Sequence, residues 1–410
     1  MKEFDRLISQ EHLNITDKTR SNLFAWRGQF SPQLIEILLK SYCLPNAVIL
    51  DPFVGSGTVL LEAGKLGFEA YGFEINPSAY ILSRIYEFIN DIQRKDSIQK
   101  VRKQIESRFP FQLSGEDPEI TNLAEIVIEI EKKSNKESNK IFEALVILLD
   151  IDKNKITNGR LWARLDSLIE IINKLPFSER NIEVGLSDAR ELPLKDNQID
   201  FVLTSPPYIN VFNYHQNYRK SAELLGWNLL KIAKSEIGSN RANRGNRFYT
   251  VVQYCLDMAD AIKEIARVSK INARIILVVG HQSNVLGVPF YNADIIEKIG
   301  VKSGYFIKVS RQKRQFKNKF GKIIREDIIN FLNAKEGCSV QILESIAREV
   351  ALNVLQSNLS FVASKNYDSL EIAISKVRDI KRTTKLNPNK SSYCLSQSAN
   401  MTNRTTVAST

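Results

Sequence analysis

Two short stretches of the sequence place chemically useful residues directly after apolar runs. The first, LDPFVGSGT, begins at Leu50 and carries two closely spaced glycines. The second is TSPPY, residues 204–208, in which two prolines and a tyrosine follow the run. Proline donates no backbone hydrogen bond and ends a ladder. The second stretch is therefore either an ordinary strand exit or a means of presenting Ser205 and Tyr208 to a substrate.

The glycine stretch is predicted to be a strand end, a tight turn and a helix start. In this geometry backbone N–H groups face a ligand, and Gly55 and Gly57 allow close approach of the backbone. Glu74 ends the next predicted strand, where nucleoside-binding folds place the carboxylate that accepts the ribose hydroxyls. Asp188 ends a third strand-like run, within reach of the same crevice. Three such features at successive strand ends favour a ligand site over a bare turn.

The spacing of the glycines limits which ligand fits. A dinucleotide fingerprint would need glycine at position 60, where the sequence has Leu60, and a P-loop would need a lysine after the glycines. A nucleoside without a phosphate chain is therefore expected. S-adenosyl-L-methionine meets that description, because it joins adenine and ribose to a zwitterionic amino acid tail beside a sulfonium. We predict it as the cofactor.

The proline-rich break suits methyl transfer to the exocyclic amine of a base. Such an amine is a poor nucleophile, because its lone pair is conjugated into the ring. Hydrogen-bond acceptors aimed at its N–H groups favour pyramidalisation as the nitrogen attacks the methyl group. The Ser205 hydroxyl and the Pro206 carbonyl can be these acceptors, and Tyr208 offers a face for the base. A base in a duplex would have to be flipped out of the stack.

Taken together, LDPFVGSGT and TSPPY resemble the DNA amino-methyltransferase family, the N4-cytosine and N6-adenine enzymes. The resemblance implies a seven-stranded methyltransferase sheet over roughly residues 20–85 and 180–333. It implies that the catalytic motif is Ser205, Pro206, Pro207 and Tyr208. It also implies cofactor-binding roles for the loop residues Asp51, Phe53, Gly55 and Gly57, for Glu74 at the ribose, for Asp188 at the adenine, and for Phe30 and Ser31 near the methionine end.

The resemblance also carries an expected substrate. Family members with SPPY are mostly N4-cytosine enzymes, so N4 of cytosine is preferred as the target. The expected function is site-specific DNA methylation in a restriction-modification system, with flipped double-stranded DNA as substrate and a cognate restriction endonuclease as candidate partner. Three alternatives stay open: an N6-adenine DNA enzyme, an RNA enzyme acting on a base amine of tRNA, and a non-catalytic nucleic-acid-binding module.

Strand-like runs and helical patterns alternate along much of the chain, which predicts an α/β fold with a doubly wound, Rossmann-like parallel sheet. The expected parallel strands are residues 47–50, 69–75, 182–187, 199–204 and 273–280. A helix at 292–300 precedes two further runs, 305–312 and 325–332, that can close the sheet as a hairpin.

The chain is expected to consist of five parts. These are 1–84 with the cofactor-binding half, 85–180 as a helical insertion, 181–333 with the catalytic half, 334–390 as a helical extension, and 391–410 as a disordered tail rich in Ser and Thr. The element that recognises the target remains open between the insertion, the loop at 209–250 and the C-terminal helices. Within that loop, YHQNY (214–218) is either a base-contacting segment or a helix start.

The formal net charge of +11 favours a polyanionic partner. Residues 301–325 hold nine Lys or Arg and no acid, and residues 209–250 hold seven against two acids. Two basic stretches, one adjoining the proline-rich motif, favour nucleic acid over a merely solvated face. SNRANRGNRFY, residues 239–249, is the first segment expected to touch DNA.

Other features exclude several classes of protein. The four cysteines are widely scattered without a CxxC pair, so neither a metal site nor a disulfide is expected. No run of eighteen apolar residues occurs, and the charged start lacks the apolar region of a signal peptide. No membrane association and a cytoplasmic location are therefore expected.

Overall fold

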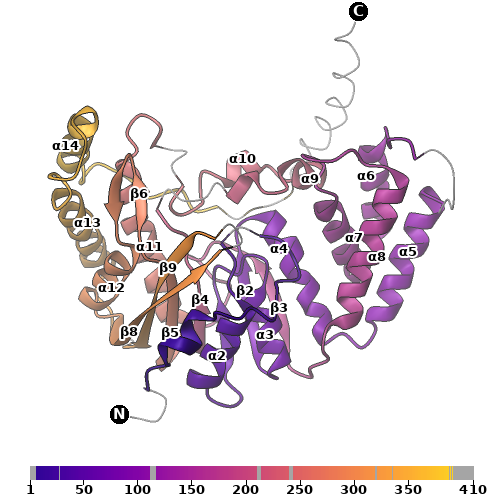
Figure 1. The fold of residues 1–410 in the computed structure, drawn as a ribbon, viewed down its shortest axis with the longest axis horizontal. Coiled ribbons are helices and arrows are strands. Elements are labelled where there is room, and N and C mark those ends of the chain that lie inside the picture. Colours follow the sequence, from indigo (N-terminus) through magenta and orange to yellow (C-terminus); the bar gives the residue numbers. More distant parts are fainter. Residues whose placement is uncertain are drawn as a thin grey trace, which may run out of the picture.

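The structure, a computed structural model, is built around one seven-stranded sheet (Figure 1). The strands lie in the order β3-β2-β1-β4-β5-β9-β8. The structure describes residues 6–26, 28–110, 117–209, 214–239, 243–318, 321–334, 336–386, 388 and 390. The sheet is parallel except for β9, and helices flank it, so the predicted α/β class with a doubly wound, Rossmann-like sheet is confirmed.

Each of the five predicted parallel strands is present. They are β1 (Val48–Asp51), β2 (Glu69–Glu74), β3 (Ile182–Leu186), β4 (Ile199–Thr204) and β5 (Ser269–Gly280). The predicted hairpin is formed by β8 (Phe306–Lys317) and β9 (Ile323–Asn333), and β9 pairs with β5 in the antiparallel direction. A small separate sheet of β6 (Ser283–Val285) and β7 (Val288–Phe290) was not predicted, because its strands are only three residues long.

Successive residues of the parallel strands are buried in different cores. Ile49 packs into one hydrophobic cluster and Leu50 into the other, as do Phe201 and Val202 on the neighbouring strand. Because neighbouring side chains of a strand point to opposite faces, a sheet covered on both faces needs continuous apolar runs. This requirement explains why these strands could be recognised in the sequence.

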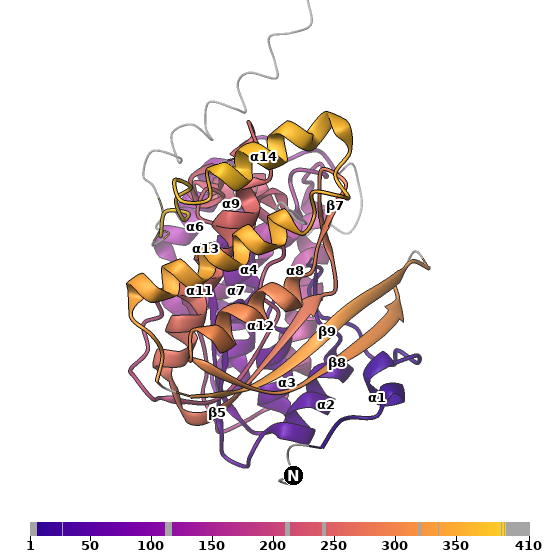
Figure 2. The same cartoon turned by 90° about the vertical axis from the view of Figure 1, so that its left-hand side faces the viewer.

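Two sets of helices cover the two faces. The first set includes α2 (Pro32–Tyr42), α3 (Thr58–Lys65), α4 (Pro77–Ser83) and the 3-10 helix η2 (Arg84–Ile89). The second includes α11 (Tyr249–Val268), α12 (Asn292–Lys302), α13 (Val340–Gln356) and α14 (Tyr367–Ser375), which lie together in Figure 2. The other short helices are α1 (Gln10–Asn14), η3 (Tyr214–Gln216), α9 (Arg219–Leu224), α10 (Leu229–Ile232) and η5 (Ser364–Asn366).

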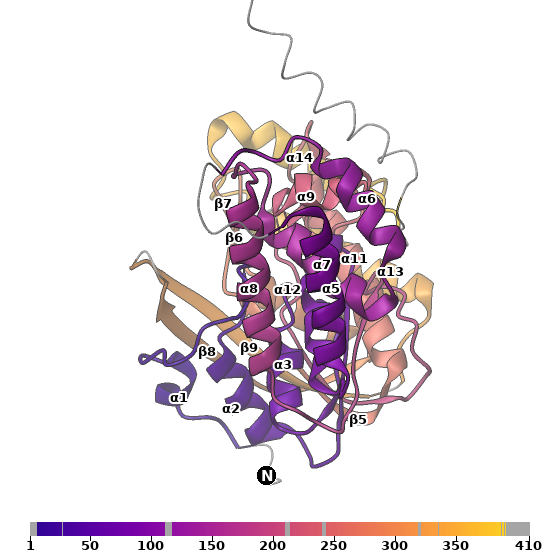
Figure 3. The ribbon, with the colours of Figure 1, turned by 90° about the vertical axis from the view of Figure 1, so that its right-hand side faces the viewer.

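The predicted insertion between β2 and β3 is helical (Figure 3). It contains α5 (Arg94–Arg108), α6 (Leu123–Lys133), α7 (Lys136–Leu149) and α8 (Asn158–Lys174). Leu145 and Trp162 of this region share one hydrophobic cluster with Ile182 of β3, so the insertion packs directly on the sheet layer. The division of the chain into five parts stays a prediction, and the tail at 391–410 lies outside the described residues.

In the described part of the chain, no helix has both the length and the apolar character needed to cross a membrane.

Candidate functional site

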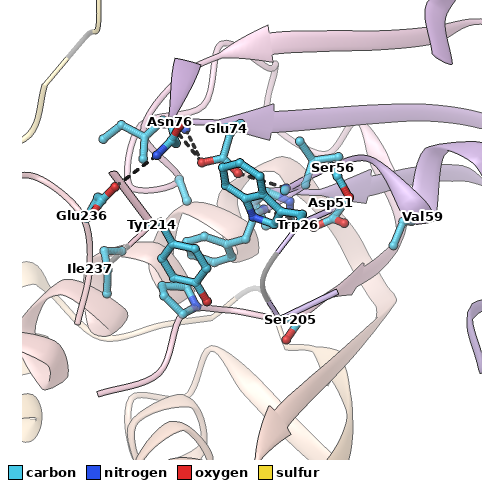
Figure 4. A pocket seen from close by; sticks show the side chains of 18 of the residues that line it. Trp26, Asp51, Ser56, Val59, Glu74, Asn76, Ser205, Tyr214, Glu236 and Ile237 are labelled. Carbon is cyan, nitrogen blue, oxygen red and sulfur yellow. Dashed lines mark hydrogen bonds between the residues drawn. The ribbon is translucent and has the colours of Figure 1, made fainter. Parts of the chain in front are cut away.

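A pocket opens at the carboxyl ends of β1, β2 and β4, with about 900 Å³ of empty space that includes open solvent at its mouth (Figure 4). The strand order reverses between β1 and β4, the position at which open α/β sheets bind ligands. Of the twelve predicted site residues, eight line this pocket: Phe30, Asp51, Phe53, Gly55, Glu74, Asp188, Ser205 and Pro207. The other four, Ser31, Gly57, Pro206 and Tyr208, do not line it.

The glycine turn leads from β1 into α3, and its two glycines have different surroundings. Gly55 and Gly57 both have positive φ, at +53° and +89°. Gly55 lies at the pocket, where its N–H donates to Glu74 Oε2 at 3.0 Å. A Cβ on Gly57 would lie 2.5 Å from the Tyr86 ring. Gly57 is therefore required by its conformation and by packing, rather than by close approach to a ligand.

Glu74 presents a carboxylate that the backbone already holds in place. Its Oε1 accepts from the N–H groups of Ile75 at 3.0 Å and Asn76 at 2.9 Å, while its Oε2 accepts from Gly55. Burial raises the pKa of Glu74 to about 7, and these backbone hydrogen bonds oppose part of that rise. Glu74 is thus a rigid acceptor whose charge changes near neutral pH.

Asp51 is the second acid of the pocket, and it is only 2% exposed. Its Oδ1 accepts from Thr204 Oγ1 at 2.5 Å and from the Phe53 N–H at 3.1 Å. Burial raises the pKa of Asp51 to about 7, against the lowering effect of these two hydrogen bonds. The bond from Thr204 connects the end of β1 to the end of β4 and the bond from Phe53 holds the glycine turn, so Asp51 ties this turn to the strand that leads into the proline-rich motif.

Asp188 lines the pocket, but its carboxylate is bound by the protein itself. Arg190 donates from Nε to Asp188 Oδ1 at 2.9 Å and from Nη2 to Oδ2 at 2.5 Å. Arg190 also donates to Asp257 Oδ1 at 2.8 Å and to Thr383. Thr383 in turn donates to Asp257 from its N–H at 3.0 Å and its hydroxyl at 2.9 Å. This buried cluster fixes the wall at Asp188 and occupies both oxygens of its carboxylate.

The proline-rich motif follows β4 directly. Ser205 and Pro207 line the pocket, whereas Pro206 is buried. The hydroxyl groups of Ser205 and Tyr208 lie 3.1 Å apart and are hydrogen-bonded. The Tyr208 ring packs against Gly280 at the end of β5, where a Cβ would lie 2.9 Å from the ring. Burial raises the pKa of Tyr208 well above its ordinary value, so the phenol stays protonated. The ring is thus held between two strand ends.

The segment before α2 contributes several pocket residues, of which Phe30 is the one that the sequence predicted. Phe30 lines the pocket, and its carbonyl accepts from Asn22 Nδ2 at 2.9 Å. Ser31 is the N-cap of α2, makes no side-chain capping bond and does not line the pocket.

The pocket also has lining residues that were not among the predicted site residues, and they include two aromatic rings, an amide and an acid. Figure 4 shows Trp26, Tyr214, Asn76 and Glu236 around the same space. The rings of Trp26 and Tyr214 are nearly parallel, with an interplanar angle of 9° and centroids 6.4 Å apart. Asn76 Nδ2 donates to Glu236 Oε1 at 3.3 Å.

Two of these residues carry a partial signal in the sequence. The aromatic segment FAWRGQF contains Trp26, and YHQNY contains Tyr214. YHQNY is both a short helix, η3, and a contributor to the pocket, because Tyr214 lines it. His215 Nδ1 lies 3.1 Å from Glu236 Oε2, which connects this segment to the far side of the pocket.

Two other predicted segments are described only in part. Residues 240–242 of the segment at 239–249 lie outside the described residues, as do 210–213 just after the proline-rich motif. Across the described residues, no group of three or more His, Cys, Asp or Glu side chains is arranged to hold a metal ion.

Comparison with known proteins points to one family. Residues 3–84 match the family described as DNA methylase, N6_N4_Mtase. The chain is 28% identical over 130 residues to the type II methyltransferase M.MjaII of Methanocaldococcus jannaschii, covering 32% of this chain and 24% of that protein. It is 25% identical over 272 residues to the type II methyltransferase M.BsoBI of Geobacillus stearothermophilus, covering 52% of this chain and 53% of that protein. The chain thus spans about a quarter and about half of the lengths of these relatives.

A solved structure of a SAM-dependent methyltransferase from Methanosarcina mazei aligns with a TM-score of 0.36 at 13% identity, covering 73% of this chain and 98% of that one. The family match includes the glycine turn and Glu74. The predicted resemblance to the DNA amino-methyltransferases and the predicted cofactor, S-adenosyl-L-methionine, are confirmed.

Proposed function

We propose that this chain, a relative of the DNA amino-methyltransferases, transfers a methyl group from S-adenosyl-L-methionine to an exocyclic amine of a DNA base, preferably N4 of cytosine. One observation carries the proposal. Ser205 and Pro207, from the predicted catalytic motif, line the same pocket as Asp51 and Glu74, from the predicted cofactor loop. A methyl donor and an acceptor amine could therefore meet there.

The charges of the pocket fit the cofactor. The described residues that line it include four acids and no Lys or Arg: Asp51, Glu74, Asp188 and Glu236. Such a wall suits a ligand with a sulfonium and an ammonium, whereas a phosphate chain would need cations or free N–H groups. In this proposal Glu74 accepts the ribose hydroxyls, Asp51 pairs with the ammonium, and the main chain around Asp188 contacts the adenine.

The catalytic motif would orient the attacking nitrogen. When bound, S-adenosyl-L-methionine supplies an electrophilic methyl group on a positively charged sulfur. The Ser205 hydroxyl and the Pro206 carbonyl would accept the two N–H groups of the amine, directing its lone pair toward that carbon. The new N–C bond forms as the S–C bond breaks, and the methylated amine then loses a proton to water. Tyr208 would fix the Ser205 hydroxyl through the bond of 3.1 Å.

The substrate follows from the relatives and the basic surface. Two curated relatives are type II methyltransferases, which supports site-specific methylation of double-stranded DNA within a restriction-modification system. A base in a duplex can reach the pocket only if it is flipped out of the stack. A cognate endonuclease is the partner that such a system implies, and the insertion at 85–180 is one candidate for target recognition.

The direct test is to incubate the purified protein with labelled S-adenosyl-L-methionine and unmethylated DNA or tRNA, then digest to nucleosides for mass spectrometry. We expect N4-methylcytosine in DNA. N6-methyladenine would keep the site and refute the preference for cytosine. Label only in RNA would refute the DNA substrate, and cofactor binding without any transfer would indicate a binding module.

Asp51→Asn tests the proposed ammonium contact through its pH dependence. Because the pKa of Asp51 is raised to about 7, wild-type affinity for the cofactor should fall as the pH drops from 8 to 6 and the carboxylate becomes protonated. The variant keeps an oxygen for Thr204 and Phe53 but has no charge to lose. It should bind at least tenfold more weakly at pH 8, at a cost of roughly 1.4 kcal/mol, and should lose part of the pH dependence, since Glu74 still titrates.

The same substitution, Asp51→Asn, should raise the stability of the fold although it weakens cofactor binding. A carboxyl whose folded pKa lies above its unfolded value binds extra protons in the folded state, so ionisation of Asp51 lowers stability as the pH rises from its ordinary pKa of 3.8 to about 7, and the loss is constant above that. Asp51→Asn should therefore be more stable than wild type at pH 8, with a smaller gain at pH 5. Calorimetric titration and thermal unfolding at both pH values measure the two effects. If Asp51→Asn bound the cofactor with the same affinity and the same pH profile as wild type, the proposed contact between Asp51 and the ammonium group would be refuted.

A further inference from the structure

The hairpin of β8 and β9 continues beyond the carboxyl ends of the parallel strands, the edge of the sheet that carries the proline-rich motif and is called its catalytic edge below. Gly280, the last residue of β5, pairs with Glu326 of β9. The pairs Gln315–Arg325, Phe316–Ile324 and Lys317–Ile323 lie further toward the tip. Tyr208 packs on Gly280, so the free part of the hairpin begins at the level of the catalytic motif. Figure 2 shows this hairpin projecting from the body of the molecule.

One face of the hairpin is covered by the N-terminal segment. Gln312 exchanges hydrogen bonds with the backbone of Ile8, at 3.1 Å and 2.7 Å. Arg314 is 4% exposed and pairs with Glu326 at 2.7 Å. The Lys18 ammonium lies 4.9 Å from the centre of the Phe316 ring. These contacts occupy the face that carries residues 312, 314 and 316, so its charge is not open to a ligand.

The opposite face carries cations without partners. Lys313, Lys317 and Arg325 are exposed and form no ion pair with any residue in the described ranges. Alternation along β8 places Lys313 and Lys317 on one face, and Arg325 joins them because it pairs with Gln315. Other cations of β8 are neutralised: Arg311 pairs with Asp294 and Asp327, and Lys308 pairs with Glu297. Among the cations of β8, positive charge without a nearby acid is thus found only in the part of the hairpin near and beyond the catalytic edge.

The base of this face is a polar hollow. His281, Tyr291, Asp294, Arg311 and Lys313 line it. His281 Nδ1 lies 2.6 Å from the buried Asp327 Oδ2, which fixes the ring at the strand end as a positioned polar group rather than a member of the catalytic motif. A backbone lying along the three cations would pass over this hollow, next to the end of β5 on whose other face the Tyr208 ring packs.

We propose that Lys313, Lys317 and Arg325 form a phosphate-contacting arm that holds the DNA backbone beside the flipped base. The proposal rests on the proposed function, because the arm is useful only next to a site that acts on DNA. Cations on an exposed strand contact phosphates, position the duplex and carry no sequence information. The arm therefore contributes affinity for every duplex, and sequence selection belongs elsewhere in the chain.

The test is the triple variant Lys313→Gln, Lys317→Gln and Arg325→Gln, compared with wild type by fluorescence anisotropy on a labelled duplex over a series of salt concentrations. The logarithm of the binding constant K falls as log salt rises, and each lost phosphate contact makes this negative slope shallower by about 0.9. The magnitude of the slope should therefore decrease by about 3 in the triple variant. The affinity near 0.1 M salt should fall on the order of 10- to 100-fold, equally for duplexes of unrelated sequence. Thermal unfolding and cofactor binding should not change.

The matched control is Lys40→Gln, Lys195→Gln and Lys270→Gln, three exposed cations near the amino ends of the parallel strands, at the edge of the sheet opposite the proline-rich motif. It removes the same charge and should leave the slope within about one unit of wild type. The proposed role of the arm would be refuted by any of four results. These are an unchanged slope in the hairpin variant, equal losses of affinity in both variants, a loss of affinity for RNA alone, or no duplex binding by wild type. Normal arm-dependent binding with no methyl transfer would instead refute the proposed function alone.

Discussion

Replacing Tyr208 by alanine should lower the turnover number of methyl transfer by about 100- to 1,000-fold while the affinity for the cofactor stays nearly constant. The Tyr208 ring packs on Gly280 and its hydroxyl is 3.1 Å from Ser205 Oγ. Alanine would free the Ser205 hydroxyl and remove the aromatic surface for the base. Tyr208 does not line the pocket where the cofactor is proposed, so binding should persist. Single-turnover kinetics with saturating cofactor measures the chemical step.

Tyr208→Phe separates the two roles of the side chain. It keeps the ring against Gly280 and removes only the hydroxyl, so we expect a loss of about tenfold, roughly one hydrogen bond. Tyr367→Ala, which removes a 40% exposed ring from α14, is the control and should leave the rate unchanged. A wild-type rate in Tyr208→Ala would exclude the residue from catalysis, and parallel losses of rate, cofactor affinity and stability would indicate a structural role.

Glu74→Ala should weaken binding of S-adenosyl-L-methionine by about 100-fold. Two hydrogen bonds from the ribose hydroxyls to a charged group contribute about 1.5 kcal/mol each, and about 3 kcal/mol corresponds to that factor. The carboxylate also anchors the glycine turn through Gly55, and that contact would be lost as well. Isothermal titration calorimetry at pH 8 gives the dissociation constant directly.

Two further variants make this result specific to Glu74. Glu183→Ala removes an exposed acid from β3 outside the pocket, so its affinity should equal that of wild type. Glu74→Asp keeps the charge but shortens the side chain, and it should fall between wild type and alanine. Equal affinity in wild type and Glu74→Ala would refute the assignment of this acid to the ribose.

The central sheet could be read from the sequence because its physical requirement is local. A strand covered on both faces must be apolar at successive positions, and Ile49 and Leu50 show this requirement in adjacent residues. The hairpin was found but its length was underestimated. Its outer part is exposed on one face and carries Lys313 and Lys317, so no apolar run marks where the strand ends.

The pocket could be predicted only as far as its strand ends. Gly55, Glu74 and Ser205 were found because each follows an apolar run that parallel strands bring to one edge. Trp26 and Glu236 come from segments without periodicity, more than 200 positions apart, and no local pattern brings them together. Arg190, the partner of Asp188, lies only two positions away in the sequence. The other residues that Arg190 binds, Asp257 and Thr383, lie 67 and 193 positions from it, so no local pattern could reveal these contacts.

The buried cluster around Arg190 has a consequence for synthesis on the ribosome. Domains fold as the chain emerges, N-terminal part first. The five strands β1 to β5 are available once Gly280 has been made, but Thr383 follows Arg190 by 193 residues. Until it arrives, Arg190 and Asp257 lack their last partners, and such a buried pair is costly to leave incomplete. The wall at Asp188 is therefore completed late in translation, and a nascent chain should acquire its sheet before it can hold its cofactor.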